Sequence, residues 1–271
     1  MSFCRTPRAG NNKKPSRIAY LCRPNQKKTM AVVPYKEKNA SKKEQVAEMF
    51  DNISHRYDFL NHLLSLGIDI RWRKQAVKFL KADQPQRILD IATGTGDFAL
   101  EVTRSLNPQE VVGVDISEGM LEVGRKKVKK KNLEHIIQLR TGDSEDLQFS
   151  DNYFDSLIVA FGVRNFENLE AGLAEMLRVL RPGGKAVIVE FSKPRVFPFK
   201  QIYNAYFKYL LPVIGNTVSS DSSAYRYLPE SVQAFPDGHD FIKVLEKLGY
   251  QNTQWKPLTF GIASIYVGEK A

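Results

Sequence analysis

The chain has 271 residues, of which 42% are hydrophobic, enough to bury one domain with a short appendage. Its formal charge of +10 does not indicate a basic domain, because the first 29 residues hold eight Lys or Arg residues and no acidic residue, which leaves the rest nearly neutral. Both cysteines lie in that segment and the four histidines are scattered, so we expect no disulfide framework and no bound metal. No run reaches ~18 apolar residues, so we expect no membrane span.

Residues 1–38 are polar and basic and lack a repeating apolar pattern, which predicts a disordered leader. The segment also has the composition of a transit peptide, and a start at Met30 is a further alternative in which the preceding residues do not belong to the protein. Residues 39–271 are predicted to form a single domain.

Residues 39–82 are predicted to form helices that precede the first strand. Residues 41–44 fit a capping box, and apolar residues at helical spacing follow. Helices in this position cover a sheet and can close the mouth of an α/β site. Tyr57 and Asp58 lie in this cover, where they either take part in chemistry or only cap and pack.

A buried strand followed by a glycine turn begins the predicted sheet. Residues 87–91 form a short apolar strand, Gly94 and Gly96 follow, and residues 99–106 continue at helical spacing. Glycines at this position let the backbone approach a bound molecule, towards which free helix N–H groups point. The next strand ends at Asp115, 21 residues after Gly94, near the roughly 20-residue interval at which a carboxylate meets a ribose. This predicts a nucleoside site, while a dehydrogenase fingerprint and a purely structural turn remain alternatives.

Two further strands end in polar residues. A strand over residues 135–139 leads to Asp143 and Ser144, and one over residues 155–160 leads to Arg164. Strands alternating with helices at this rhythm predict a doubly wound α/β fold with a mostly parallel sheet, whose ligands bind at the carboxyl ends of the strands. We therefore expect these side chains beside the glycine turn.

The basic run of residues 125–131 offers an RNA-binding alternative. Cations at the carboxyl end of a helix complement its dipole and usually form a solvated face. We therefore expect this run to be a solvated surface.

The remaining segments complete a seven-stranded sheet. The fifth strand covers residues 185–190, and the last two cover about residues 252–256 and 262–267, with the final strand inserted antiparallel. Residues 197–230 form an insertion, in which one helix face is apolar: Phe199, Ile202, Tyr203, Tyr206, Phe207, Leu210 and Leu211. Such a face packs on the protein's own core, on a hydrophobic substrate or on a bilayer surface.

Two longer motifs resemble the signatures of the UbiE/MenG/Coq5 family of quinone C-methyltransferases. They are Tyr57-Asp-x-x-Asn61-x-x-x-Ser65-x-Gly67 with Trp72, and the run from Arg178 to Ser192; residues 160–165 and 225–231 also resemble the family. The likeness extends from about Met30 to the end of the chain, with one departure at Asp69, where the first signature usually has histidine. The resemblance implies a class I methyltransferase fold that uses S-adenosylmethionine.

The resemblance also implies C-methylation of an isoprenoid quinol, with demethylmenaquinol of menaquinone biosynthesis as the expected substrate. The alternative substrate is 2-methoxy-6-polyprenyl-1,4-benzoquinol, which is methylated in ubiquinone biosynthesis. Two other functions also remain as alternatives, an NAD-dependent dehydrogenase and an RNA-binding or RNA-modifying protein. We expect a polyprenylated quinol as partner, transient contact with a membrane surface and no nucleic acid, and a homodimer is left open. The expected location is the cytoplasm, peripheral at the inner face of the membrane.

In the family's cofactor site the matching positions are Thr95, Asp115, Asp143 and Ser144, and the glycine turn adds Gly94 and Gly96. The residue types agree with this assignment. Asp115 can accept hydrogen bonds from both ribose hydroxyls, and the carboxylate of Asp143 can meet the adenine amino group.

The implied reaction needs a base that removes a quinol proton and a group that stabilises the resulting phenolate. We predict that Arg164 stabilises the phenolate, that Tyr57 and Asp58 approach from the cover helices, and that a water held by them can act as the base.

Overall fold

The structure is a computed structural model that describes residues 32–65, 67–206, 209 and 223–271. Most of the predicted leader, both cysteines, and Phe207, Leu210 and Leu211 of the predicted apolar helix face lie outside the described residues. Among the helices it describes, none has the length and apolar composition needed to cross a bilayer. The same part of the chain contains no group of three or more His, Cys, Asp or Glu residues placed to bind a metal ion.

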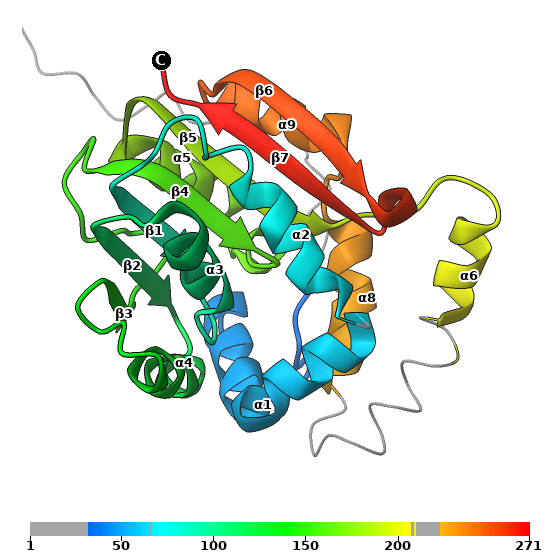
Figure 1. Cartoon of the computed structure of the whole chain (residues 1–271). Coiled ribbons are helices and arrows are strands. Elements are labelled where there is room, and N and C mark those ends of the chain that lie inside the picture. Colours follow the sequence, from blue (N-terminus) through cyan, green and yellow to red (C-terminus); the bar gives the residue numbers. More distant parts are fainter. Residues whose placement is uncertain (1–31, 66, 207–208, 210–222) are drawn as a thin grey trace, which may run out of the picture. The chain divides into compact units, whose positions relative to one another are not determined.

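A seven-stranded sheet forms the centre of the fold (Figure 1). Its strands are β1 (Arg87–Ile91), β2 (Glu110–Asp115), β3 (Ile137–Thr141), β4 (Phe154–Ala160), β5 (Leu180–Phe191), β6 (Gln251–Leu258) and β7 (Ala263–Glu269). The strand order is β3-β2-β1-β4-β5-β7-β6, and only the pairs that include β7 are antiparallel within this sheet. The predicted α/β fold with a mostly parallel sheet is therefore confirmed.

Two strands begin two or more residues away from their predicted starts. β3 begins at Ile137 rather than at residue 135, because a turn precedes it in which the Ile137 N–H donates to the Leu133 carbonyl at 2.8 Å. β5 begins at Leu180 rather than at Lys185, because the chain enters the sheet directly from the preceding helix and absorbs its Pro-Gly-Gly segment as an irregularity in the pairing with β4.

Helices cover both faces of the sheet, because successive residues of a strand point to opposite sides. One face carries α2 (Ile68–Val77), α3 (Asp97–Leu106) and α4 (Glu118–Lys130), and the other carries α5 (Leu169–Val179) and α9 (His239–Lys247). Neighbours in β1 show the consequence: Ile88 is buried in the first layer and Leu89 in the second.

Helix α1 (Lys42–Ser65) is a single helix of 24 residues that lies across the carboxyl ends of the strands (Figure 1). It begins with the predicted capping box, in which Ser41 N–H donates to Glu44 at 2.9 Å and Glu44 N–H donates to the Ser41 hydroxyl at 3.2 Å. Tyr57 and Asp58 lie within it, on the side of the sheet where ligands bind in doubly wound folds.

The insertion contributes α6 (Phe199–Ala205) and α8 (Ser223–Ala234). Helix α6 projects from the body of the domain, while α8 runs beside α1 (Figure 1). Tyr227 of α8 is buried against Val46 and Met49 of α1, so these two helices form one wall at the sheet edge.

Candidate active site

The turn after β1 has a backbone conformation that glycine adopts without strain. Gly94 has a φ of 56° and Gly96 a φ of 77°, both in the left-handed region. A Cβ on Gly94 would lie 3.2 Å from the terminal methyl of Met120. The Gly94 N–H donates to Oδ2 of Asp115 at 2.8 Å, so the turn is tied to the end of β2.

Asp115 is half-buried at the end of β2, where its Oδ1 accepts the Ser117 N–H at 2.9 Å. Desolvation raises the pKa of this carboxyl to about 6, and the backbone donors of Ser117 and Gly94 oppose the rise. Above pH 6 the group is therefore a carboxylate with two of its acceptor positions filled by backbone and others available to the hydroxyls of a ligand.

Asp143 and Ser144 follow β3 and line, together with Asp115 and the glycine turn, a cavity of about 70 Å³. Oδ1 of Asp143 accepts the Glu145 N–H at 2.9 Å, while Oδ2 contacts the ammonium of Lys43 on α1. The walls are mostly apolar: Val46, Phe50, Val114, Ile116, Met120 and Phe166. Apolar walls that end in a carboxylate suit a flat heterocycle with an exocyclic amine.

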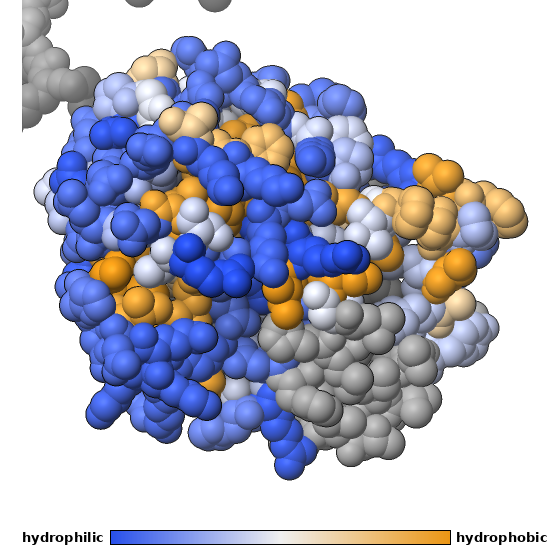
Figure 2. Space-filling view, viewed as in Figure 1, coloured by the Kyte–Doolittle hydropathy of each residue, from blue (hydrophilic) through white to orange (hydrophobic). Residues whose placement is uncertain are grey.

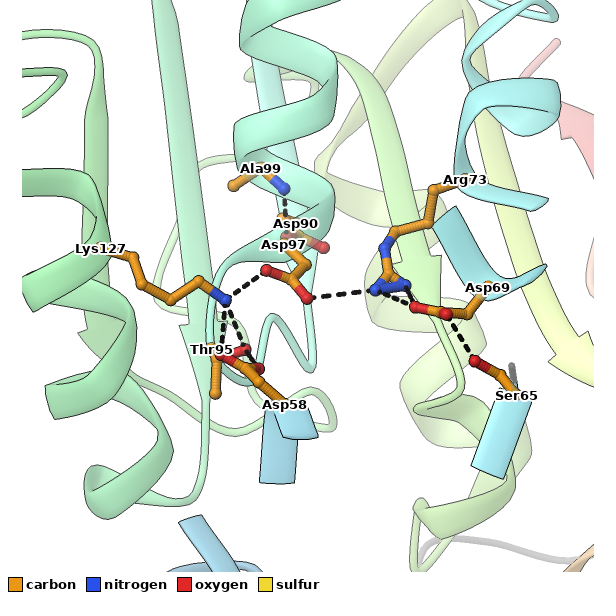
Figure 3. Close-up of polar contacts among 9 residues, drawn as sticks. All are labelled: Asp58, Ser65, Asp69, Arg73, Asp90, Thr95, Asp97, Ala99 and Lys127. Carbon is orange, nitrogen blue, oxygen red and sulfur yellow. Dashed lines mark hydrogen bonds and ion pairs between the residues drawn. The ribbon is translucent and has the colours of Figure 1, made fainter. Parts of the chain in front are cut away.

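A second cavity, of about 40 Å³, has three charged residues in its lining, and Figure 3 shows their polar contacts. Arg73 of α2, Asp90 of β1 and Asp97 of α3 all reach it. The buried guanidinium of Arg73 donates to Asp69 at 2.8 Å and to Asp97 at 3.2 Å. Such a cluster, with cations and carboxylates side by side, suits the paired charges of an amino-acid group.

Lys127 and Asp58 extend this cluster. Oδ1 of Asp58 accepts the Thr95 hydroxyl at 2.5 Å, and Lys127 donates to Oδ2 of Asp58 at 2.9 Å and to Thr95 at 3.1 Å, besides contacting Asp97. The expectation of a solvated face for the basic run is therefore wrong for Lys127, because α4 directs this residue at the turn after β1.

Asp90 is buried in β1, where its Oδ2 accepts the Thr93 hydroxyl at 2.6 Å and the Ala99 N–H at 3.0 Å. Desolvation raises its pKa to about 7, against the effect of these two donors. A cation bound in the second cavity would favour the charged form of this carboxyl.

The two small cavities share Tyr57, Ala92, Gly94, Ala160 and Phe161, so they are the two ends of one elongated site. A nucleoside joined to an amino acid has the same order of chemical groups, which is the pattern of S-adenosylmethionine. A further observation favours a ligand here: Oδ1 of Asn165, beside the first cavity, is buried with no hydrogen-bond partner among the described residues.

A third cavity, of about 340 Å³, has an apolar and aromatic lining, and we call it the chamber. Its walls come from α1, α2, α6 and α8 and from the ends of β4 and β5; the aromatic members are Phe50, Tyr57, Trp72, Phe161, Phe191, Phe199, Tyr203, Tyr206, Tyr225 and Tyr227. Tyr57 and Phe161 line all three cavities. The elongated site therefore meets the chamber at these two side chains.

Arg164, just past β4, is the one charged side chain among the described residues that line the chamber. Its Nη1 donates to Glu190 of β5 at 2.7 Å, and Glu190 is fully buried. Its Nε is also buried and has no hydrogen-bond partner in the described part of the chain. The ion pair thus fixes a cation at the wall of an apolar chamber.

Tyr57 is the second predicted catalytic residue that reaches the chamber. Burial raises the pKa of its phenol to about 12, although Arg164 and Arg73 oppose the rise. At neutral pH the hydroxyl is therefore protonated and can donate a hydrogen bond but cannot take a proton. Asp58, in contrast, lies at the charged end of the elongated site and is not among the residues that line the chamber, so its predicted role beside Arg164 stays a prediction.

Helix α1 makes a set of contacts that were not predicted from the sequence. Lys42 donates to the carbonyls of Arg164 at 3.1 Å and Phe166 at 2.8 Å, and Asp51 accepts the Ser117 hydroxyl at 2.6 Å and the Gly119 N–H at 2.9 Å. With Lys43 and Asp58, the helix contacts the loops after β1, β2, β3 and β4. The signal was present in the sequence, because Lys43, Asp51 and Asp58 are eight and seven residues apart, which places them on one helix face.

The sequence profile of the ubiE/COQ5 methyltransferase family matches residues 38–270. The chain belongs to this family. A Bacteroides fragilis relative named "Demethylmenaquinone methyltransferase" is 48% identical over 239 residues, which are 88% of this chain and 97% of the relative. A Geobacter sulfurreducens relative named "Ubiquinone/menaquinone biosynthesis C-methyltransferase UbiE" is 49% identical over 230 residues, 84% of this chain and 90% of the relative.

Solved structures share the fold at low identity. A Thermotoga maritima protein described as a SAM-dependent methyltransferase and possible histamine N-methyltransferase matches with a TM-score of 0.57 at 20% identity, covering 83% of this chain and 99% of that one. The [4+2]-cyclase SpnF matches with a TM-score of 0.61 at 15% identity, covering 84% of this chain and 96% of that one. The predicted class I methyltransferase fold is confirmed.

Membership of the ubiE/COQ5 methyltransferase family decides between the two enzyme classes that the glycine turn left open, in favour of the methyltransferase. The predicted cofactor, S-adenosylmethionine, agrees with the family. The structure brings Gly94, Asp115, Asp143 and Ser144 together around the first cavity and places Thr95 at the second. Their contacts with the cofactor stay predictions.

Proposed function

We propose that the chain transfers the methyl group of S-adenosylmethionine to a ring carbon of demethylmenaquinol. The observation that carries this proposal is the meeting of the elongated site with the apolar chamber at Tyr57 and Phe161. The relatives named for demethylmenaquinone methylation support the choice of substrate. The benzoquinol of ubiquinone biosynthesis stays the alternative substrate, since the name of the Geobacter relative mentions both ubiquinone and menaquinone biosynthesis.

The chain's own residues supply what the reaction requires. When bound, S-adenosylmethionine brings a methyl group that is already activated. Arg164, held by Glu190 at 2.7 Å, offers positive charge to a phenolate in surroundings where an uncompensated anion would be costly. Tyr57 donates a hydrogen bond and orients the ring, and a water at the junction takes the phenol proton, because the tyrosine itself remains protonated. After the methyl group has been transferred, the ring carbon releases its own hydrogen as a proton, which restores the aromatic ring.

Contact with a membrane surface follows from the substrate's tail. Bringing an apolar chain into water costs about 0.8 kcal/mol per CH₂ group, so a tail of three isoprene units, or fifteen carbons, would cost on the order of 12 kcal/mol. We propose that the tail stays in the bilayer while the ring enters the chamber, with the protein peripheral at the inner face of the membrane. A cytoplasmic location and the absence of nucleic-acid binding stay predictions.

Turnover of two quinols by the purified protein tests the proposal. We expect methylation of short-tailed demethylmenaquinol and slower methylation of the benzoquinol, both followed by mass spectrometry. Arg164→Ala is expected to lower kcat by about 10²- to 10³-fold, as removal of an oxyanion donor does, and to leave the affinity for S-adenosylhomocysteine unchanged. Arg104→Ala, at an exposed ion pair with Glu101, is the matched control.

One result would overturn the proposed substrate, and another would overturn the proposed role of Arg164. Turnover of the benzoquinol without the naphthoquinol would assign the alternative substrate. Unchanged turnover in Arg164→Ala would remove the arginine from the mechanism.

A further inference from the structure

Large apolar side chains are exposed in one region of the domain. Six such residues are exposed in the part of the chain that the structure describes: Ile70, Val196, Phe197, Ile202, Tyr209 and Phe260. All except Ile70 belong to the region of α6 and the turn before β7, and these five are between 61% and 76% exposed. Figure 2 shows hydrophobic atoms gathered over α6, where the helix projects from the body. We call Val196, Phe197, Ile202, Tyr209 and Phe260 the α6 patch.

A ring stack joins the two parts of the α6 patch. Phe199 of α6 stacks on Phe260 with ring centroids 3.6 Å apart and planes within 6°. Phe260 lies in the 3-10 turn η3 (Thr259–Gly261), between β6 and β7. Segments about 60 residues apart in sequence therefore present one continuous surface rather than scattered apolar residues.

The α6 patch is continuous with the chamber. Ile202 is 61% exposed and also lines the chamber, as does Phe199, one of the two stacked rings. Thr259 and Ile262, on either side of the Phe260 turn, line it as well. An apolar molecule can thus pass from the patch into the chamber while it stays in contact with apolar side chains.

Basic side chains accompany the α6 patch. Arg195 and Lys200 are exposed on the segment that carries Phe197, and Lys193 lies two residues before Arg195. Asp237, the acidic partner of Lys193 at 3.0 Å and of Arg195 at 3.4 Å, is buried. Exposed cations beside exposed aromatic and aliphatic groups are the pattern of a segment that lies at the interface of an anionic bilayer.

We propose that the α6 patch docks on an anionic bilayer, with its apolar side chains at the boundary of headgroups and acyl chains, so that a quinol ring moves from lipid to chamber without crossing water. The route of the ring rests on the proposed function, whereas the docking itself does not. A bilayer is favoured over a second copy of the chain, because a symmetric interface places the same patch of both copies face to face and so brings the cations Arg195 and Lys200 of one copy near those of the other.

Vesicle binding by the full chain tests the docking, without quinol or cofactor. We expect co-sedimentation with vesicles of phosphatidylcholine and phosphatidylglycerol, and weak binding to phosphatidylcholine alone. Phe197→Ser combined with Val196→Ser is expected to weaken binding by about 10- to 100-fold, the loss for one or two apolar side chains. Lys200→Glu is expected to weaken it at least about fivefold and to lower its dependence on anionic lipid. Ile70→Ser, which removes an exposed apolar side chain outside the patch, is the control and is expected to bind like the unaltered chain.

Turnover separates docking from chemistry. With a tail-less quinol in solution, the Val196 and Phe197 double variant is expected to turn over at the rate of the unaltered chain. With long-tailed quinol in vesicles, its turnover rate is expected to fall by about the same factor as its vesicle binding. Failure of the unaltered chain to methylate either quinol would refute the proposed function but not the docking. Unchanged vesicle binding in both altered chains would overturn the docking, as would a dimer in solution that the double variant converts to monomer.

Discussion

Asp115 offers a direct test of the nucleoside end of the elongated site. Its carboxylate accepts the N–H groups of Gly94 at 2.8 Å and Ser117 at 2.9 Å, which leaves acceptor positions for two hydroxyls. A hydrogen bond to a charged group contributes about 1.5–3 kcal/mol. Loss of two such bonds in Asp115→Ala is therefore expected to cost about 3–6 kcal/mol, or a hundred- to ten-thousandfold weaker binding of S-adenosylhomocysteine.

The same carboxyl predicts how binding depends on pH. Its pKa in the free protein is about 6, and only the charged form accepts from both hydroxyls, so affinity is retained above pH 6 and falls as the pH drops through that value. One pH unit below the pKa the loss is roughly tenfold. Asp115→Asn is expected to remove this step and to leave the one near pH 7 that arises from Asp90.

Isothermal titration calorimetry with S-adenosylhomocysteine between pH 5 and 8 measures both effects. Glu101→Gln, which alters a carboxylate of α3 paired with Arg104 and absent from the lining of both small cavities, is the matched control and is expected to bind like the unaltered chain. If Asp115→Ala binds within a few-fold of the unaltered chain, Asp115 does not hold the ligand, and the assignment of the first cavity to a nucleoside fails with it.

Three further predictions follow from buried or shared charges. Glu190→Gln leaves Arg164 without its counter-charge, so we expect the free energy of unfolding to fall by about 3–5 kcal/mol in chemical denaturation and quinol turnover to slow. An unchanged free energy of unfolding would show that the ion pair does not stabilise the fold. The folded pKa of Asp90, about 7, lies above the unfolded value of 3.8, so its contribution to stability is full below pH 3.8, and about 4 kcal/mol is lost as the pH rises from there to 7. Asp90→Asn is therefore expected to raise the unfolding temperature above that of the unaltered chain by more at pH 8 than at pH 5, and an equal rise at both pH values would contradict this. Lys43→Ala frees the Asp143 oxygen predicted to meet the adenine amine, so we expect about two- to fivefold tighter binding of S-adenosylhomocysteine in calorimetry, whereas weaker binding would mean that Lys43 itself contacts the ligand.

Much of the cofactor end could be predicted from the sequence, because parallel strands end at one edge of their sheet. Asp115 ends β2, Gly94 and Asp143 follow β1 and β3 by two or three residues, and the adjacency of these strands brings the three residues to one cavity. The local sequence pattern was sufficient to predict these positions, since the alternation of strands and connecting helices determines which residues lie at the carboxyl edge of the sheet.

The rest depends on contacts between distant segments. Arg73 meets Asp97 from 24 residues away and Lys127 meets Asp58 from 69, and neither pair has a local signature. The partner of Arg164 is Glu190, and the two are joined by the pairing of β4 with β5 rather than by any spacing in the sequence. The charged cluster and the buried ion pair were therefore visible only once the fold was known.

We predict that the cofactor lies along the elongated site with its sulfur at Tyr57 and Phe161, facing the chamber. A crystal structure of the protein with S-adenosylhomocysteine tests it most directly. We expect the ribose on Asp115, the amino-acid group beside Arg73 and Asp97, and the sulfur at the junction of the three cavities. A sulfur atom sealed from the chamber, or a ligand bound away from Asp115, would contradict this placement of the cofactor.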